Sequence, residues 1–189
     1  MIDDLYTRFQ HDTGIGIAYL FCDFRRQHEQ QIESLLANLV KQLAQKQTSM
    51  PTTVKCLFDQ YEGKPKRPSF DEISKALHLV TSLYSKAFII IDALDECQVT
   101  DGCRRRLLFE IFNLQASKRV NIFSTSRFIP EILETFKESV SLEIRASDED
   151  VQSYLTGHMT QLPSFVLGRH DLQNEIKATI SKAVAGMCV

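Results

Sequence analysis

The chain has 189 residues, of which 43% are hydrophobic and 24% charged, a composition typical of globular proteins. This apolar content excludes disorder as the main state, and no apolar run approaches the ~18 residues of a transmembrane helix. With 22 basic and 24 acidic residues the net charge is −2, which creates no overall attraction toward nucleic acids or anionic membranes. We therefore expect neither a nucleic-acid partner nor a membrane span.

The amino-terminal part of the chain alternates between helical and strand-like patterns. Apolar side chains at helical spacing predict a helix over residues 2–10, and the apolar run 15–21 predicts a strand buried on both faces. A period of 3.6 residues predicts an amphipathic helix over 32–43, and a weaker helix follows over 52–61. Helices and strands are therefore expected to alternate from the start.

The middle of the chain continues this alternation. Ser69 and Glu72 have the spacing of a capping box and open a predicted helix that runs to Tyr84. Residues 87–92 then form a second apolar run that ends in acid, which predicts another buried strand. A helix over 104–115 and a third strand over 120–125 complete the pattern.

The carboxyl-terminal part is predicted to be mostly helical. A short helix is expected from Pro130 to Phe136, and Ser147 is expected to cap a helix that follows it. Between them, apolar residues alternate with polar ones over 140–144, which predicts a strand with one wet face near a sheet edge. A last helix is expected from Asp171 onward.

Strands that alternate with helices indicate an α/β fold in which a parallel sheet is flanked by helices. We assign residues 1–146 to this α/β core and residues 147–189 to the start of an all-helical subdomain.

The cysteines and the amino terminus bear on location. The five cysteines have irregular spacing and form no CxxC pair; they are Cys22, Cys56, Cys97, Cys103 and Cys188. A disulfide framework or a zinc site needs more regular spacing, so we expect free thiols in a reducing compartment. Residues 1–5 lack a basic region followed by an apolar core, so we predict no secretory signal and a cytoplasmic location.

Three acids follow the strongest apolar run of the chain. Residues 88–91 are all large and apolar, and Asp92, Asp95 and Glu96 come directly after them. Ligands of open parallel sheets bind at the carboxyl ends of the strands, where one carboxylate can hold Mg²⁺ through water and another can polarise an attacking water. The alternative is that Asp95 and Glu96 cap the next helix and face solvent.

The third predicted strand also ends in polar residues, Ser124, Thr125, Ser126 and Arg127. An arginine at this place can reach a terminal phosphate, and the hydroxyls can orient water. The alternative is an arginine paired with a surface acid. Both predicted strands consist of an apolar run followed by polar residues. This common pattern favours one site formed by the two strand ends.

A phosphate-binding loop of the form GxxxxGK[ST] is missing from the sequence. The one Gly-Lys pair, Gly63-Lys64, is followed by Pro65 and has no strand before it. Gly14 and Gly16 precede a strand and not a helix. The residues therefore predict a sheet edge that can hold Mg²⁺ and contact a phosphate, but that has no phosphate-binding loop.

These segments resemble the NACHT-type signal-transduction ATPases, and among them the nephrocystin-like group of filamentous-fungal repeat proteins. Residues 16–24 are similar to the second strand of that family, residues 88–96 to its Walker B segment, and residues 121–127 to its sensor strand. Residues 148–154 and 185–187 are similar to its helical subdomain. The resemblance extends over nearly the whole chain.

The resemblance implies binding of ATP or GTP with Mg²⁺, slow hydrolysis, and oligomerisation controlled by the nucleotide. Asp92 matches the magnesium-associated acid, Asp95 and Glu96 the hydrolytic acids, and Arg127 the sensor arginine. It also implies protein partners or self-association. Because the Walker A loop and the first strand of the family are missing, we expect a truncated domain with weak or no nucleotide binding and no activity on its own.

Two other functions are open on the sequence. The first is a scaffold module whose acids have no catalytic task and whose sheet presents surfaces to a partner. The second is an unrelated magnesium-dependent phosphohydrolase, which needs a second acidic cluster. The sequence offers Asp3-Asp4 and Asp148-Glu149-Asp150 for it, and neither follows a buried strand.

Overall fold

The computed structural model describes residues 2–117 and 120–184. The chain divides into two compact units, which we call unit 1 (Met1–Ile129) and unit 2 (Pro130–Val189). The division into two domains at residues 146/147 stays a prediction. Residues 185–187 and Cys188, which the sequence analysis used, lie outside the described residues.

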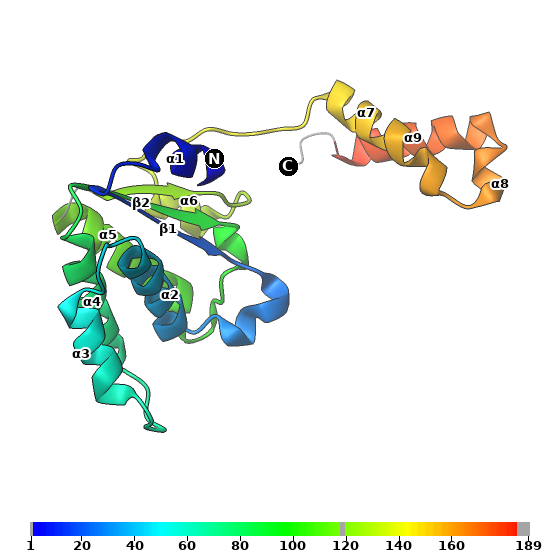
Figure 1. Cartoon of the computed structure of the whole chain (residues 1–189). Helices are drawn as coiled ribbons and strands as arrows, with labels where there is room; N and C mark the ends of the chain where they lie inside the picture. The colour runs from blue at the N-terminus through cyan, green and yellow to red at the C-terminus, as the bar shows by residue number, and fades with distance from the viewer. Residues whose placement is uncertain (1, 118–119, 185–189) are drawn as a thin grey trace. The chain divides into compact units, whose positions relative to one another are not determined.

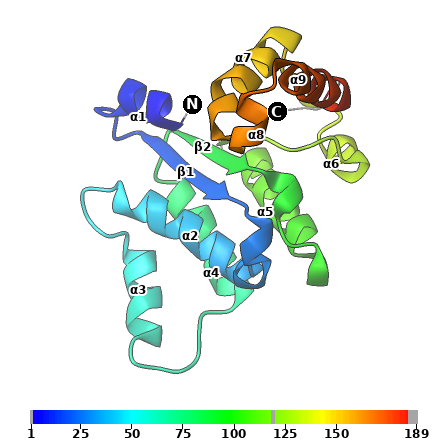
Figure 2. The same cartoon turned by 90° about the vertical axis from the view of Figure 1, so that its right-hand side faces the viewer.

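Unit 1 is built on a parallel sheet of three strands in the order β1-β2-β3. The strands are β1 (Ile15–Phe21), β2 (Lys86–Asp92) and β3 (Val120–Ser124). Ile15 pairs with Lys86 and Phe21 with Asp92, so β1 and β2 are in register from end to end. Figure 2 shows their arrowheads at the same edge of the sheet. The α/β fold and all three strands of this unit are as predicted.

Helices cover both faces of this sheet (Figure 1). Helix α1 packs on β1 from one side, and α2, α4 and α5 form a layer on the other, with α3 against α4. Their bounds are α1 (Ile2–Phe9), α2 (Ile32–Gln45), α3 (Thr52–Tyr61), α4 (Phe70–Thr81) and α5 (Cys103–Ser117). No helix in the described part of the chain is both long and apolar enough to cross a bilayer.

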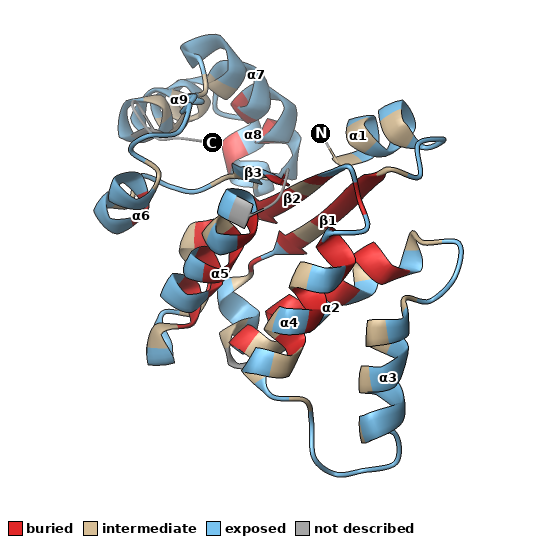
Figure 3. Ribbon diagram, turned by 90° about the vertical axis from the view of Figure 1, so that its left-hand side faces the viewer, coloured by how far each residue is buried: buried red, intermediate tan, exposed pale blue. Residues whose placement is uncertain are grey.

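The core of unit 1 lies on both faces of β2. Most residues of this strand are buried, as the colours in Figure 3 show. Ile90 packs with Ile15 and Ile17 in a cluster that α1 covers through Ile2, Leu5 and Phe9. Because side chains alternate along a strand, Ile89 and Ile91 face the layer of α2, α4 and α5, and both are fully buried. This two-sided burial explains why the sequence of β2 is continuously apolar.

The start of α4 is the capping box that the sequence predicts. The Ser69 hydroxyl accepts a hydrogen bond from the Glu72 backbone N–H, and the Glu72 carboxylate accepts one from the Ser69 N–H at 2.8 Å. The Tyr61 hydroxyl, at the end of α3, also donates to Glu72. Since α3 has no buried residue, this contact helps to hold it against α4.

Stability is expected to fall in acid as this capping box loses its charge. Hydrogen bonds from the backbone and the hydroxyl of Ser69, and then from Tyr61, lower the pKa of Glu72 from 4.5 to about 2. A lowered carboxyl pKa stabilises the folded state above the unfolded value, and this contribution is lost as the pH falls from 4.5 toward 2. Urea unfolding at pH 5 and pH 3 measures the decrease in the free energy of unfolding. This decrease should be smaller in Glu72→Gln, which has no carboxylate to protonate. An equal pH dependence in the variant would contradict the assignment.

Unit 2 is helical throughout its regular part. Its helices are α6 (Pro130–Thr135), α7 (Asp148–His158), α8 (Ser164–Leu167) and α9 (His170–Val184). Helices α7 and α8 pack against α9. Ser147 caps α7 as predicted, with Asp150 returning the second hydrogen bond of a capping box.

The strand predicted over residues 140–144 is wrong, because the structure forms no strand there. Val140, Leu142 and Ile144 are 104%, 83% and 62% exposed. An alternating pattern provides one apolar face, but a strand also needs a neighbour to pair its backbone N–H and C=O groups. Among the described residues, β3 is paired with β2, and residues 140–144 belong to no strand.

Candidate functional site

The chain turns sharply where β2 ends. Ala93 follows Asp92 with φ 52° and ψ 49°, in the left-handed region that costs a residue with a side chain about 1–2 kcal/mol. A 3-10 turn over Leu94–Glu96 comes next, anchored by the fully buried Leu94. The Ala93 N–H donates to the Thr125 hydroxyl at 2.8 Å, and the Leu94 N–H donates to the Thr125 carbonyl at 2.9 Å. The neighbouring strand end therefore holds the strained turn in place.

Asp92 is bound to the same threonine. The Thr125 hydroxyl donates to Asp92 Oδ1 at 2.6 Å while it accepts from Ala93. The sequence suggested that this hydroxyl orients water. In the structure its single O–H already donates to the carboxylate of Asp92. Asp92 is half-buried, and its second oxygen, Oδ2, accepts no hydrogen bond from the described residues.

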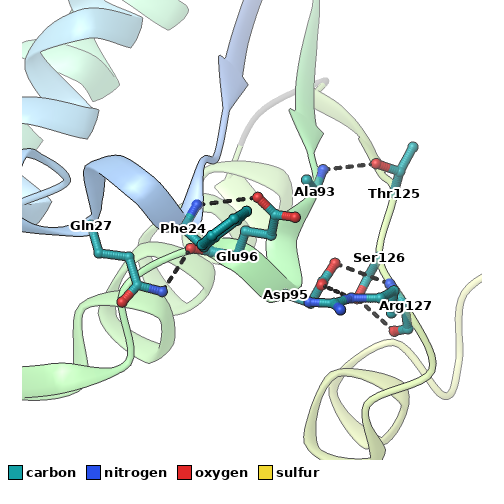
Figure 4. Close-up of polar contacts among 8 residues, drawn as sticks. All are labelled: Phe24, Gln27, Ala93, Asp95, Glu96, Thr125, Ser126 and Arg127. Atoms are coloured by element: carbon teal, nitrogen blue, oxygen red, sulfur yellow. Dashed lines mark hydrogen bonds and ion pairs between the residues drawn. The ribbon is translucent and has the colours of Figure 1, made fainter. Parts of the chain in front are cut away.

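Asp95 pairs with Arg127 across the two strand ends (Figure 4). The Arg127 backbone N–H donates to Asp95 Oδ1 at 3.0 Å, and Arg127 Nε donates to Oδ2 at 2.5 Å. The Asp95 side chain is 4% exposed, whereas that of Arg127 is 71% exposed. Burial raises the pKa of Asp95, but the hydrogen bonds and the charge of Arg127 together outweigh it, so the pKa lies below its ordinary value.

Glu96 contacts the segment that follows β1, the strand on the other side of β2. Its Oε2 accepts the Phe24 N–H at 3.1 Å, and its carbonyl accepts the Gln27 side-chain amide at 3.3 Å. Both partners belong to the 3-10 helix Phe24–Glu29 that follows β1. Figure 4 shows these contacts of Glu96 together with those of Asp95. With the bond of Asp92 to Thr125, each of the three acids therefore bonds to a strand end or loop beside β2.

The structure brings together all four residues that the sequence singled out. Asp92, Asp95, Glu96 and Arg127 meet at the carboxyl edge of the sheet because parallel strands end on the same side. Arg127 is paired with an acid, as the alternative interpretation had it, but that acid is Asp95 of the same site. The catalytic and magnesium roles of these residues stay predictions.

The roles of Phe24 and Gln27 are not predictable from the sequence. No pattern in the sequence marks them, because Phe24 contributes a backbone N–H and Gln27 lies in a short polar segment without a periodic pattern. Thr125 was noticed as part of a polar strand end, but its bond to Asp92 depends on the register of β2 and β3.

The acids fit a magnesium ion held mainly by water. Mg²⁺ takes one or two carboxylates together with waters and phosphate oxygens, and Asp92 Oδ2 offers one such ligand. No group of three or more His, Cys, Asp or Glu in the described part of the chain is placed to hold a metal by itself. An ion at this edge would depend on further oxygens from solvent or a ligand.

The residues fit a nucleoside triphosphate less well than they fit Mg²⁺. A phosphate cradle needs a glycine-rich loop that leads from a strand into a helix and presents free backbone N–H groups. After β1 the first two N–H groups of the 3-10 helix, those of Phe24 and Arg25, already bond to Glu96 and Asp23. After β2 the chain passes through Ala93, which is not a glycine. None of the three described strands leads through such a loop.

A hollow in the described part of unit 1 lies away from this site. It has a volume of about 490 Å³ and is lined by Ile15, Ser85, Lys86, Val120 and Asn121. These residues lie at the amino ends of the three strands, opposite the acids. Its place therefore gives no support to a ligand at the carboxyl edge.

Comparison with known proteins relates this site to one family. Residues 1–127 match the family described as Nephrocystin 3, N-terminal. The matched region covers more than half of the chain, and it contains the whole sheet and all four candidate residues up to Arg127. A search of curated proteins found no match.

Proposed function

The chain belongs to the nephrocystin 3 N-terminal family, and from this premise we propose that unit 1 is part of a nucleotide-dependent signalling switch of the NACHT type. In this proposal the unit supplies the magnesium-associated acid and the phosphate-sensing arginine. The observation that carries it is the convergence of Asp92, Asp95, Glu96 and Arg127 at the ligand-binding edge of a parallel sheet. Cytoplasmic location and protein partners or self-association belong to the same proposal.

Each residue has a task in this switch. Asp92 would hold Mg²⁺ through water, and Mg²⁺ would neutralise charge on the phosphates of ATP or GTP. Asp95 and Glu96 are the candidates for orienting or polarising water, and Arg127 for contacting the terminal phosphate. Asp95 and Glu96 both hold neighbouring loops in this structure, so any action on water would require them to exchange partners.

Nucleotide affinity of this chain is expected to be weak. The backbone N–H groups and the lysine of a phosphate loop contribute much of the binding free energy in such sites, and the acids cannot replace them. We expect a Kd for Mg-ATP and Mg-GTP weaker than about 10 µM, or no binding and no hydrolysis by the chain alone.

Calorimetry with the full chain tests this expectation. The variant Asp92→Asn should abolish any binding of Mg-ATP and any rise in melting temperature that Mg²⁺ alone produces. A matched control is Asp101→Asn, since Asp101 is exposed, lies on another turn at φ 57°, and asparagine tolerates that conformation. If the control variant responds to Mg²⁺ or Mg-ATP, an equal response of Asp92→Asn would reject the magnesium role of Asp92.

A scaffold function is the second candidate, and one observation favours it. All three acids accept hydrogen bonds from neighbouring strand ends or loops, as residues with a purely structural role would. This function predicts that Asp92→Ala lowers stability while Mg²⁺ and nucleotides leave the melting temperature of the wild-type chain unchanged. The thermal measurement above separates the two candidates.

A further inference from the structure

The two outer edges of the three-stranded sheet differ in how their backbone groups are used. On the β1 edge, the side-chain oxygen of Gln42 accepts the Tyr19 N–H at 2.9 Å, and its side-chain nitrogen donates to the Tyr19 carbonyl at 2.7 Å. The glutamine amide, which α2 carries, thus takes the place of a neighbouring strand. The opposite edge belongs to β3, and no further strand of the described residues lies beside it.

The hydrogen bonds of Thr125 show which backbone groups of β3 face outward. The Thr125 N–H donates to the Ile91 carbonyl, and the Thr125 carbonyl accepts the Leu94 N–H, so both groups face β2. Backbone groups change sides from one residue to the next along a strand. The residues whose N–H and C=O groups face away from β2 are therefore Val120, Ile122 and Ser124. No loop or helix backbone in the described part of the chain bonds to these groups.

The sequence of this edge favours pairing with another strand. Residues 120–126 contain no charge, no proline and no glycine, and four of the seven are strand-forming Val, Ile, Phe and Thr. Edges that stay unpaired are usually protected by lysine, proline or a bulge. Phe123 adds a large apolar side chain that is 46% exposed. The β3 edge therefore offers backbone groups and an aromatic ring to a partner strand.

We propose that β3 pairs antiparallel with β3 of a second copy of this chain, around a two-fold axis at Ile122. In this register each Ile122 lies opposite its counterpart, and Val120 lies opposite Ser124. All outward groups then meet as hydrogen-bonded pairs, each of which exchanges two N–H···O bonds. The inference goes beyond the proposed function, because this pairing requires neither Mg²⁺ nor a nucleotide.

The chemistry of the strand favours a second copy as the partner. Because residues 120–126 carry no charge, two copies meet without like charges opposite each other. Phe123 then lies opposite Asn121, and the two Phe123 side chains become diagonal neighbours, a separation that aromatic rings can bridge. Pairing thus covers, on each copy, an aromatic ring that the single chain leaves exposed.

Sedimentation velocity of the full chain without nucleotide tests for the dimer. One strand pair buries less area than a standard interface, so we expect a weak dimer with a Kd on the order of 10–100 µM. The sedimentation coefficient should rise from monomer toward dimer between roughly 5 and 500 µM protein. A monomer over this whole range would overturn the proposal.

A charge exchange tests the register. Phe123→Glu removes the aromatic pair and places two carboxylates diagonally, so the Kd should rise about tenfold. The double variant Asn121→Lys/Phe123→Glu places lysine opposite glutamate on both sides of the axis, and it should recover about fivefold of this loss at low salt. The matched control is Phe58→Glu, since Phe58 is 58% exposed on α3 and the change in charge is the same. This control should leave the Kd unchanged.

The variants also show how the proposal would fail. A dimer that Phe123→Glu weakens no more than Phe58→Glu would place the interface elsewhere and overturn the β3 pairing. A double variant that associates no better than Phe123→Glu would overturn the antiparallel register. Asn121 and Phe123 are both exposed, so their replacement opens no cavity in the core, and thermal melts check that each variant folds.

Hydrogen exchange of the wild type needs no variant. The Ile122 and Ser124 N–H groups should exchange more slowly as the protein concentration rises, while the Thr125 N–H, which bonds to β2, is protected at every concentration. Equal protection of all three in a dilute monomer would place a segment of the same chain on this edge and overturn the proposal. Association that appears only with Mg-ATP would overturn it too, and would leave the proposed switch standing.

Discussion

Replacing Ile91 with alanine should lower the free energy of unfolding of unit 1 by about 2–5 kcal/mol. Ile91 is fully buried and belongs to β2, the central strand, which pairs on both sides. Its side chain faces the layer of α2, α4 and α5, so truncation removes apolar contact and leaves a cavity that rigid neighbours cannot fill. The loss is large because this strand joins both halves of the core.

Chemical denaturation of the wild type and two variants measures this effect. Ile91→Val removes one methylene and should lower the free energy of unfolding by about 0.5–1.5 kcal/mol. A smaller loss than in Ile91→Ala shows that the effect grows with the size of the cavity and does not come from any substitution at this position. Phe123→Ala is a surface comparison on β3, because Phe123 is 46% exposed. A loss in Ile91→Ala no larger than in Ile91→Val would show that the position is not packed as the structure has it.

Replacing Gly16 with alanine should also destabilise unit 1, by about 1–2 kcal/mol. A Cβ at Gly16 would lie 2.9 Å from Tyr84 Cδ2 and 3.0 Å from Leu43 Cδ2. The Tyr84 ring cannot move away easily, because it is buried and its hydroxyl donates to the Leu43 carbonyl. Crowding therefore outweighs the gain of about 0.4–1 kcal/mol that alanine brings by restricting the unfolded chain.

A double-mutant cycle tests whether Tyr84 is the cause. In the background Tyr84→Ala the ring is gone, so the further change Gly16→Ala should cost less than about 0.5 kcal/mol. Gly157→Ala is a control in unit 2, where a Cβ would meet nothing within 4 Å. Equal costs of Gly16→Ala in both backgrounds would assign the crowding to another neighbour.

The three acids of the candidate site hold neighbouring segments in place, and they are also the residues proposed to act on a ligand. Asp92 secures the end of β3, Asp95 the segment after it, and Glu96 the loop after β1. A loss of ligand response in any of these variants must therefore be read beside its stability. Melting in the absence of ligand provides that baseline for each variant.

Local sequence patterns were enough for much of the fold. The run of residues 88–91 predicts β2 because few structures other than a strand covered on both faces bury four successive large apolar side chains. The pair Ser69 and Glu72 predicts the start of α4, because a capping box depends on contacts within four residues. The chemistry of the strand ends is also visible, since Asp92, Asp95, Glu96 and Arg127 stand in the sequence directly after apolar runs.

Contacts between distant segments were not predictable in this way. The alternation over 140–144 satisfies the pattern of a strand, but strand formation depends on a pairing partner that the sequence does not reveal. Likewise, no spacing indicates that Glu96 accepts the Phe24 N–H across 72 residues. The short helix α8 was not predicted either, because four residues are too few for a periodic pattern.

The sequence by itself determined the order of helices and strands in unit 1 and the residue types at the carboxyl edge, because burial on a strand or helix leaves a local periodic record. The tertiary structure decided the partners of those residues: Thr125 for Asp92, Arg127 for Asp95 and Phe24 for Glu96. It also decided that residues 140–144 form no strand. The physical reason is that pairing depends on strand register and loop path, which arise from the packing of segments far apart in the chain.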